Sequence, residues 1–179
     1  GGGTQTRDAM GDLVRSEKMI EVVSNLLESN EDVHVNLTAC AVLRCIAHID
    51  INDMASCNRV LQHMYKVVER FEGQQSDDVT TVMGHAAGVI RTLVSLKGMK
   101  ETVGNEAAGV VVQMLKVTDQ DTVTHQWSLG ALRQYVLADT DTLNQENANA
   151  ACEAGAVTAC AQALSTHRDN VEVVLQSAG

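Results

Sequence analysis

The fold is indicated by one stretch of the sequence, Val35-Asn36-Leu37-Thr38-Ala39-Cys40-Ala41-Val42-Leu43-Arg44-Cys45-Ile46-Ala47. Its apolar residues recur at offsets 0, 4, 7, 8, 11 and 12, and they are Val35, Ala39, Val42, Leu43, Ile46 and Ala47. An α-helix completes a turn in about 3.6 residues, so these side chains lie on one side of a helix. The small Ala39 lets a neighbouring helix approach closely. The stretch therefore predicts an amphipathic helix that packs against another helix.

The same stripe recurs further along the chain. A second copy has identical offsets and consists of Val82, Ala86, Val89, Ile90, Leu93 and Val94. A third copy reads Thr124, Ser128, Ala131, Leu132, Tyr135 and Val136, and a fourth begins with Val174 and Ala178. Repeated helical units of this kind bury their apolar sides against one another in a stacked array. We therefore predict an all-α fold.

A second apolar helix precedes each stripe, with apolar residues at offsets 0, 1, 4, 7 and 8. The four sets are Met19, Ile20, Val23, Leu26, Leu27; Val60, Leu61, Met64, Val67, Val68; Ala107, Ala108, Val111, Met114, Leu115; and Ala156, Val157, Cys160, Ala163, Leu164. Their last members recur with a period in the forties, which is typical of armadillo or HEAT repeats. We expect a tail or the end of a preceding helix in residues 1–16, and repeats at about 17–50, 51–97, 98–139 and 140–179, the last incomplete.

Polar turns separate the paired helices. They are Ser29–Val33, Ser76–Val79, Asp119–Val123 and Arg168–Val171, and each contains an acidic residue. Such side chains accept hydrogen bonds from the unpaired N–H groups that begin a helix, so we expect capping rather than metal binding. A short additional helix is predicted before the second helix in two repeats, at 142–153 and at 97–103.

These features together resemble the armadillo repeat family. The resemblance rests on Gly155-Ala156-Val157 followed by an apolar stripe, an Asp/Asn-Val turn, and a stripe with small residues, as in Val35–Ala47. It covers about residues 17–179 and is strongest at 143–179 and 33–47. It implies a right-handed superhelix of about four repeats, whose third helices line a concave groove for extended peptides. Three helices per repeat favour armadillo over HEAT.

The resemblance also implies two ladders of peptide contacts, and both are absent. Armadillo proteins of the importin-α and β-catenin groups carry an Asn late in the third helix, where this chain has Cys45, Thr92 and Gln134. Importin-α adds a Trp four residues earlier, where this chain has Ala41, Gly88 and Gly130. An importin-like adaptor for basic peptides is therefore only the alternative interpretation. Gln134 is kept among the candidate peptide contacts.

Three arginines recur in place of those ladders: Arg44, Arg91 and Arg133 each follow the Leu or Ile of the stripe. This position lies off the buried side of the helix, and stacking would align the three guanidinium groups. Such a ladder could bind carboxylates or phosphates. The alternative is that each Arg pairs with acidic residues of a neighbouring repeat or is simply solvated.

Two larger side chains share a register one turn earlier. His85 and Trp127 correspond to Thr38, and they could form a patch in the groove because Trp is enriched at interface hot spots. A Trp packed in a gap between repeats is the other interpretation.

The composition argues against several other classes of protein. The chain has 179 residues, a formal net charge of −10, no proline and 2% aromatic residues. The negative charge opposes non-specific binding of nucleic acid, which needs Lys and Arg. No catalytic motif, phosphate-binding loop or convergent metal ligands are present, so we expect no enzyme, cofactor or metal. Of the five cysteines, Cys40, Cys152 and Cys160 lie on faces of small residues and are expected in the core.

The most economical interpretation is a non-catalytic scaffold that binds a protein or an extended peptide, acidic or phosphorylated if the Arg ladder makes the contact. No apolar run approaches the ~20 residues of a membrane span, and no signal-peptide pattern opens the chain. With five cysteines and no Cys-x-x-Cys, a cytoplasmic or nuclear location is expected. The C-terminal end should expose Val171, Val174 and Leu175, which predicts a longer array, self-association through this end, or a purely architectural role.

Overall fold

The computed structural model describes residues 18–51, 54–96, 100–117, 121–137 and 142–178. Apart from an isolated bridge between Leu137 and Leu143, the regular structure in these ranges is α-helical, which confirms the all-α prediction. The expected tail in residues 1–16 lies outside them. The helices are α2 (Met19–Ser29), α3 (Val33–Asp50), α4 (Met54–Arg70), α5 (Asp77–Ser95), α6 (Lys100–Val117), α7 (Thr122–Val136), α8 (Gln145–Glu153), α9 (Ala156–Thr166) and α10 (Val171–Ala178).

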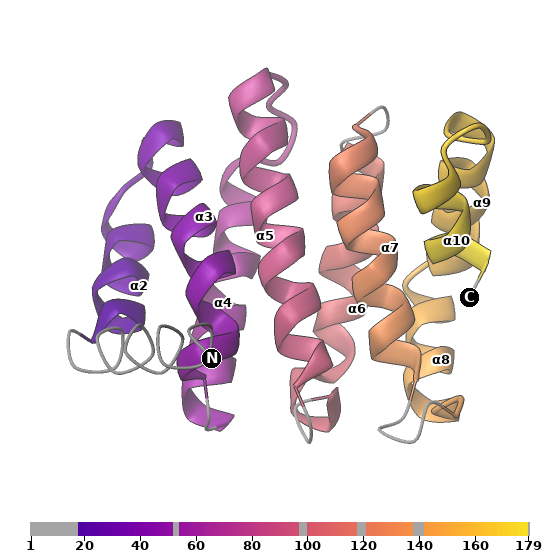
Figure 1. The fold of residues 1–179 in the computed structure, drawn as a ribbon, viewed down its shortest axis with the longest axis horizontal. Coiled ribbons are helices and arrows are strands. Elements are labelled where there is room, and N and C mark those ends of the chain that lie inside the picture. Colours follow the sequence, from indigo (N-terminus) through magenta and orange to yellow (C-terminus); the bar gives the residue numbers. More distant parts are fainter. Residues whose placement is uncertain (1–17, 52–53, 97–99, 118–120, 138–141, 179) are drawn as a thin grey trace, which may run out of the picture.

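The helices form two layers that run the length of the molecule (Figure 1). In the front layer α3, α5, α7 and α10 pack on one another in chain order, and in the second layer α2, α4, α6 and α9 do the same. Each front helix also packs on the helix that precedes it in its own repeat, such as α4 on α5 and α6 on α7. The stripes of α5 and α7 therefore meet in one continuous stack, as the repeated pattern predicted.

The apolar stripes form the core between the layers. In α5 all six stripe residues are at most 1% exposed, and the predicted apolar sets of α4 and α6 are buried throughout. The outermost helices of the stack are covered less completely, with Leu26 of α2 at 43% exposed and Val157 of α9 at 66%. Burial thus follows position in the stack, because an inner repeat has a neighbour on both sides.

The polar turns cap the third helices. Asp32 Oδ1 accepts hydrogen bonds from the backbone N–H of His34 (2.9 Å) and Val35 (3.1 Å). Asp121 Oδ2 accepts one from Thr124 N–H at 2.6 Å. In the remaining two turns Ser76 and Asn170 make the equivalent contact. The predicted capping role is therefore confirmed, with an acidic residue in two turns and a neutral one in the others.

The predicted short first helix is correct in one repeat and wrong in another. In the last repeat α8 ends at Glu153, and the chain turns through Gly155, whose φ of 92° is a conformation that favours glycine, before α9 begins. In the third repeat Lys97 lies outside the described residues, and α6 runs from Lys100 to Val117 without a break. One helix therefore carries both residues 100–103 and the apolar set that follows, with Gly104 inside it.

A partly buried polar brace joins the first two repeats. Arg70 Nη1, at the end of α4, donates to the carbonyl oxygens of Leu27 (3.0 Å) and Asn30 (2.7 Å) and to Asn36 Oδ1 (2.7 Å). The fully buried Asn36 donates in turn to the carbonyls of Asn30 and Asp32. The guanidinium thus satisfies acceptors at the end of α2 and on α3.

The last front helix, α10, ends after eight residues. Val171 (69%) and Leu175 (56%) are exposed, as predicted, but Val174 is half-buried and its neighbour Val173 is the fully buried residue. The prediction for the cysteines is correct only in part. Cys40 is buried, Cys160 is half-buried and Cys152 is exposed.

Candidate functional site

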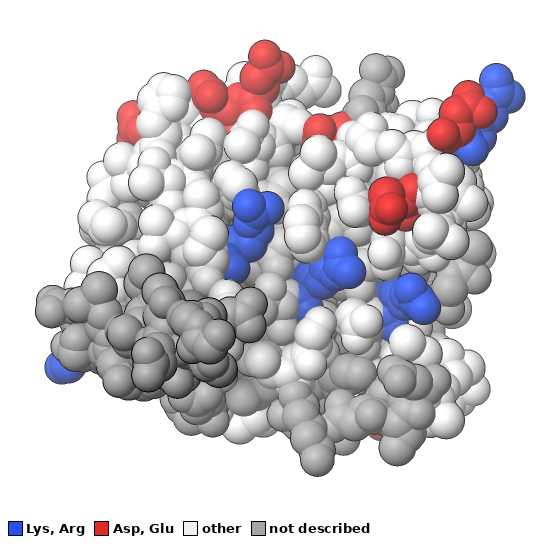
Figure 2. Space-filling view, in the orientation of Figure 1, with Lys and Arg blue, Asp and Glu red and all other residues white. Residues whose placement is uncertain are grey.

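The predicted arginines lie on the face formed by the front layer. Arg44 comes from α3, Arg91 from α5 and Arg133 from α7, and all three are half-buried. In Figure 2 blue side chains cross the middle of this face in a row, whereas red side chains gather along the upper edge and toward α10. Acidic residues stand at the N-termini of these helices: Asp32 caps α3, Asp77 and Asp78 lie in the first turn of α5, and Asp121 caps α7.

Each of the first two arginines lies across a glycine of the next front helix. A Cβ added to Gly88 would stand 2.6 Å from Arg44 Cδ, and one added to Gly130 would stand 2.9 Å from Arg91 Nε. Real Cβ atoms essentially never approach so closely, so the absence of a side chain at both glycines lets each arginine lie flat on its neighbour. Gly88 and Gly130 are the positions that the armadillo resemblance matches to the Trp of importin-α. Here the preceding repeat's arginine fills that space.

Trp127 joins the two arginines. The Arg44 guanidinium carbon lies 5.5 Å from the centroid of the Trp127 ring, and that of Arg91 lies 5.0 Å from it. Both are cation–π distances, and each such contact contributes roughly 0.5–1 kcal/mol at an exposed site. The two interpretations of Trp127 thus converge, because the half-buried ring packs between repeats and also holds the arginines in place. We call Arg44, Arg91 and Trp127 the Arg–Trp cluster.

Within the described part of the chain the cluster has no carboxylate partner. The ion pairs found there are His34–Asp78, Lys66–Glu28 and Arg168–Asp169, none of which includes Arg44 or Arg91. The prediction that neighbouring acids neutralise these arginines finds no support in those residues. Two positioned guanidinium groups with unused donors can bind carboxylate or phosphate oxygens in a bidentate manner.

His85 stands beside Arg44 in a small surface cavity of about 180 Å³. The cavity lies between the N-terminal half of α5 and the start of α7, and its wall includes Thr81 and Asp121. Partial burial lowers the pKa of His85, and the nearby charge of Arg44 lowers it further. The imidazole is therefore neutral at pH 7, so it offers a hydrogen bond rather than a charge next to Arg44.

No described contact joins the remaining two predicted residues to this cluster. Arg133 lines a different groove, between α7, α8 and α9, and its Nε is buried without a hydrogen-bond partner among the described residues. Gln134 is half-buried on α7, and no described contact joins it to Trp127 or to an arginine. Of the predicted site residues, the structure thus brings Arg44, Arg91 and Trp127 together, with His85 beside Arg44, and the role of all six in binding stays a prediction.

Sequence reasoning also missed the role of the glycines. Gly88 and Gly130 were treated as lost contact residues, although each precedes an arginine of the ladder by three residues. That recurrence is the signal that could have identified them. When helices of this kind stack, the glycine of one helix leaves space for the long arginine side chain of its neighbour. The Arg70–Asn36 brace had no comparable signal, since the two residues belong to different repeats.

The comparisons with known proteins add no assignment. No protein-family model matches this sequence, and no curated protein matches it as a relative. Among the described residues, no helix is both long enough and apolar enough to cross a membrane.

Proposed function

We propose that this protein is a non-catalytic scaffold that binds an extended acidic or phosphorylated segment of a partner protein along the face of α3, α5 and α7. The observation that carries the proposal is the Arg–Trp cluster. Its arginines are oriented by Gly88, Gly130 and the Trp127 ring, and within the described chain no carboxylate occupies their donors. Such donors, fixed before binding, lose little conformational entropy when a ligand arrives.

An extended peptide suits this surface because the cluster spans three parallel helices rather than enclosing a pocket. Acidic side chains of the peptide would meet Arg44 and Arg91, and an apolar or aromatic side chain would pack on Trp127. Trp and Arg are the residue types that most often dominate binding energy at interfaces. His85 would add a neutral hydrogen-bonding group at the edge of the site.

We propose further that the stack is an armadillo-type right-handed superhelix and that this face is its concave side. The support is the two-layered packing with a period in the forties, together with the α8–α9–α10 unit, which has three helices. We place the scaffold in the cytoplasm or the nucleus. All five cysteines are free thiols in this structure, which fits a reducing compartment.

The test uses the fluorescence of Trp127, because it is the chain's single tryptophan. Acidic, phosphorylated and basic peptides of equal length are titrated at low and high salt. We expect the acidic and phosphorylated peptides to bind and to change the emission. In the Arg44→Ala/Arg91→Ala variant their affinity should fall by roughly a hundredfold, since two charge-assisted contacts are worth about 3 kcal/mol or more.

A charge-matched control separates the site from the overall charge. Arg59→Ala/Lys66→Ala removes two exposed positive charges from α4 in the other layer, and it should leave the affinity nearly unchanged. Equal weakening by both variants would mean that net charge alone controls binding. Binding of the basic peptide, with no effect of the arginine changes, would support the importin-like alternative instead.

A further inference from the structure

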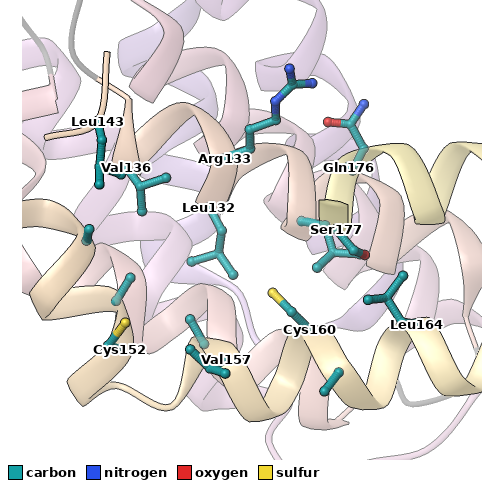
Figure 3. Close-up of a pocket in the computed structure, with 15 residues that line it drawn as sticks. Leu132, Arg133, Val136, Leu143, Cys152, Val157, Cys160, Leu164, Gln176 and Ser177 are labelled. Carbon is teal, nitrogen blue, oxygen red and sulfur yellow. The ribbon is translucent and has the colours of Figure 1, made fainter. Parts of the chain in front are cut away.

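A polar cavity lies beside the Arg–Trp cluster, between the N-terminal half of α5 and the start of α7. Its volume of about 180 Å³ is far more than a single water molecule needs, so a side chain of a bound segment fits into it. The groove beside Arg133, in contrast, has a largely aliphatic wall (Figure 3). Charged and hydrogen-bonding groups in the wall therefore distinguish the cavity from that groove.

Two sides of the cavity carry opposite charges. Arg44 reaches it from α3, and Asp121 stands at the start of α7. Neither residue belongs to an ion pair among the described residues. Asp121 Oδ2 accepts the capping hydrogen bond from Thr124 N–H at 2.6 Å, and a carboxylate has lone pairs for further bonds. An occupant thus meets a charged donor on one side and a charged acceptor on the other.

Other polar side chains in the wall are uncharged. Partial burial and the charge of Arg44 lower the pKa of His85, so the imidazole is neutral at pH 7. The Thr81 hydroxyl donates to the carbonyl oxygen of Asp77 at 2.8 Å, so toward the cavity it can only accept. The charges that an occupant meets in the wall are therefore those of Arg44 and Asp121.

This arrangement disfavours a charged occupant. A carboxylate or phosphate would be repelled by Asp121, and Asp77 and Asp78 in the first turn of α5 add negative charge. A Lys or Arg side chain would be repelled by Arg44 in the same way. An aliphatic side chain would displace water from both charged groups without replacing its hydrogen bonds. A carboxamide suits both sides, because it is neutral and combines a carbonyl acceptor with an NH₂ donor.

We propose that this cavity binds the carboxamide side chain of a Gln or Asn in the segment that lies on the Arg–Trp cluster, an inference that rests on the function proposed above. The carboxamide oxygen accepts from Arg44, its NH₂ group donates to Asp121, and His85 is a further hydrogen-bonding partner. An arginine has several N–H donors, so Arg44 can hold the carboxamide and an acidic residue of the segment together. The cavity thus selects among acidic segments by one neutral amide residue.

The test compares peptides that differ in one side chain. A peptide of Glu and Ser carries a single test residue that is moved along its length, and binding is followed by the emission of Trp127, the chain's single tryptophan. At the position that meets the cavity, Gln should bind about tenfold more tightly than Glu, Lys or Met. These three side chains are also long, but they offer an acceptor only, a donor only or neither.

Asp121→Asn tests the polarity of the cavity. Asn is as good a helix cap as Asp, so α7 keeps its cap, and thermal unfolding verifies this. Because the new amide can donate, the peptide with Glu at the test position should now bind as tightly as the one with Gln. The matched control is Asp32→Asn, which removes the same charge from the cap of α3, outside the cavity. It should leave the preference for Gln unchanged.

Arg91→Ala separates the cavity from the rest of the binding face. Arg91 belongs to the Arg–Trp cluster but does not line the cavity, so this change should weaken every peptide by a similar factor and keep the preference for Gln. Equal binding of all test residues at every position, with this weakening intact, would overturn the carboxamide site and leave the proposed function standing.

Two other results would also overturn the carboxamide site. A preference for Lys would assign the cavity to a cation held by Asp121, and a preference for Glu would assign it to a carboxylate held by Arg44. If no acidic peptide binds the parent protein at any position, the proposed function fails and the carboxamide site fails with it.

Discussion

Arg44 of α3 lies across Gly88 of α5 so closely that a Cβ on the glycine would stand 2.6 Å from Arg44 Cδ and 3.2 Å from its Cγ. Because Gly88 has no side chain, it leaves the space in which the side chain of Arg44, from the preceding repeat, lies. Gly130 and Arg91 repeat the relationship one step along the stack. The ligand binding that we propose for this face thus depends on two residues that have no side chain of their own.

Gly88→Ala should displace Arg44 from Trp127 and weaken the binding of acidic peptides. An Ala normally favours a helix over Gly by about 1 kcal/mol, so thermal unfolding should show little loss of stability while the binding is reduced. Trp127 emission, which senses the nearby guanidinium, reports the displacement. The matched control is Gly109→Ala in α6, where an added Cβ meets no atom within 4 Å. That variant should be more stable and bind normally.

Arg70→Ala should lower the free energy of unfolding by about 2–4 kcal/mol, because it leaves the buried Asn36 Oδ1 and two carbonyls without their charged donor. Denaturant unfolding measures the loss. The control is Lys66→Ala, which lies on α4 like Arg70 and removes an exposed ion pair with Glu28 of α2. It should lower the free energy of unfolding by less than about 1 kcal/mol. Similar losses in the two variants would show that the brace adds nothing beyond an ordinary surface pair.

Met83→Ala and Leu175→Ala compare a front helix in the middle of the stack, α5, with the last front helix, α10. Met83 is fully buried in α5, whereas Leu175 is 56% exposed in α10. We expect the first change to cost about 2–5 kcal/mol through the cavity it leaves, and the second to cost close to zero. Chemical denaturation of both variants checks this, and a large loss for Leu175→Ala would mean that α10 is covered in solution.

Stability should decrease as the pH falls below the usual pKa of histidine. Burial lowers the pKa of His63. The negative charge of Glu28 partly opposes this decrease, whereas the positive charges of Lys66 and Arg59 add to it. The unfolded chain therefore takes up a proton near pH 6.5, whereas the folded protein does so only at a lower pH. The contribution of neutral His63 to the free energy of unfolding is therefore complete above about pH 6.5, and it is lost as the pH falls toward the folded-state pKa.

The His63→Gln variant removes this proton uptake. Its free energy of unfolding, measured by urea titration at a series of pH values, should decline less steeply on acidification than that of the parent protein. His85→Gln should act in the same direction, because the pKa of His85 is also lowered. Parallel pH curves for parent and variants would contradict this assignment.

The sequence by itself determined the order and the stacking of the helices. The offsets in Val35–Ala47 repeat in Val82–Val94 and Thr124–Val136, and helical periodicity converts such offsets directly into a buried side. The caps at Asp32 and Asp121 could be predicted for the same reason, since they depend on residues three or fewer positions away. Local patterns determine local structure, and repetition extended that structure along the chain.

Only the tertiary structure decided which of the predicted site residues lie together. Arg44, Gly88 and Trp127 come from three helices, and their contact depends on how far apart and in what register those helices pack. The same packing placed Arg133 in a separate groove, left α6 unbroken and exposed Cys152. Contacts between repeats join residues that are far apart in the chain, such as Arg44 with Gly88 and Arg70 with Asn36, and no spacing within one helix encodes the distance between two helices.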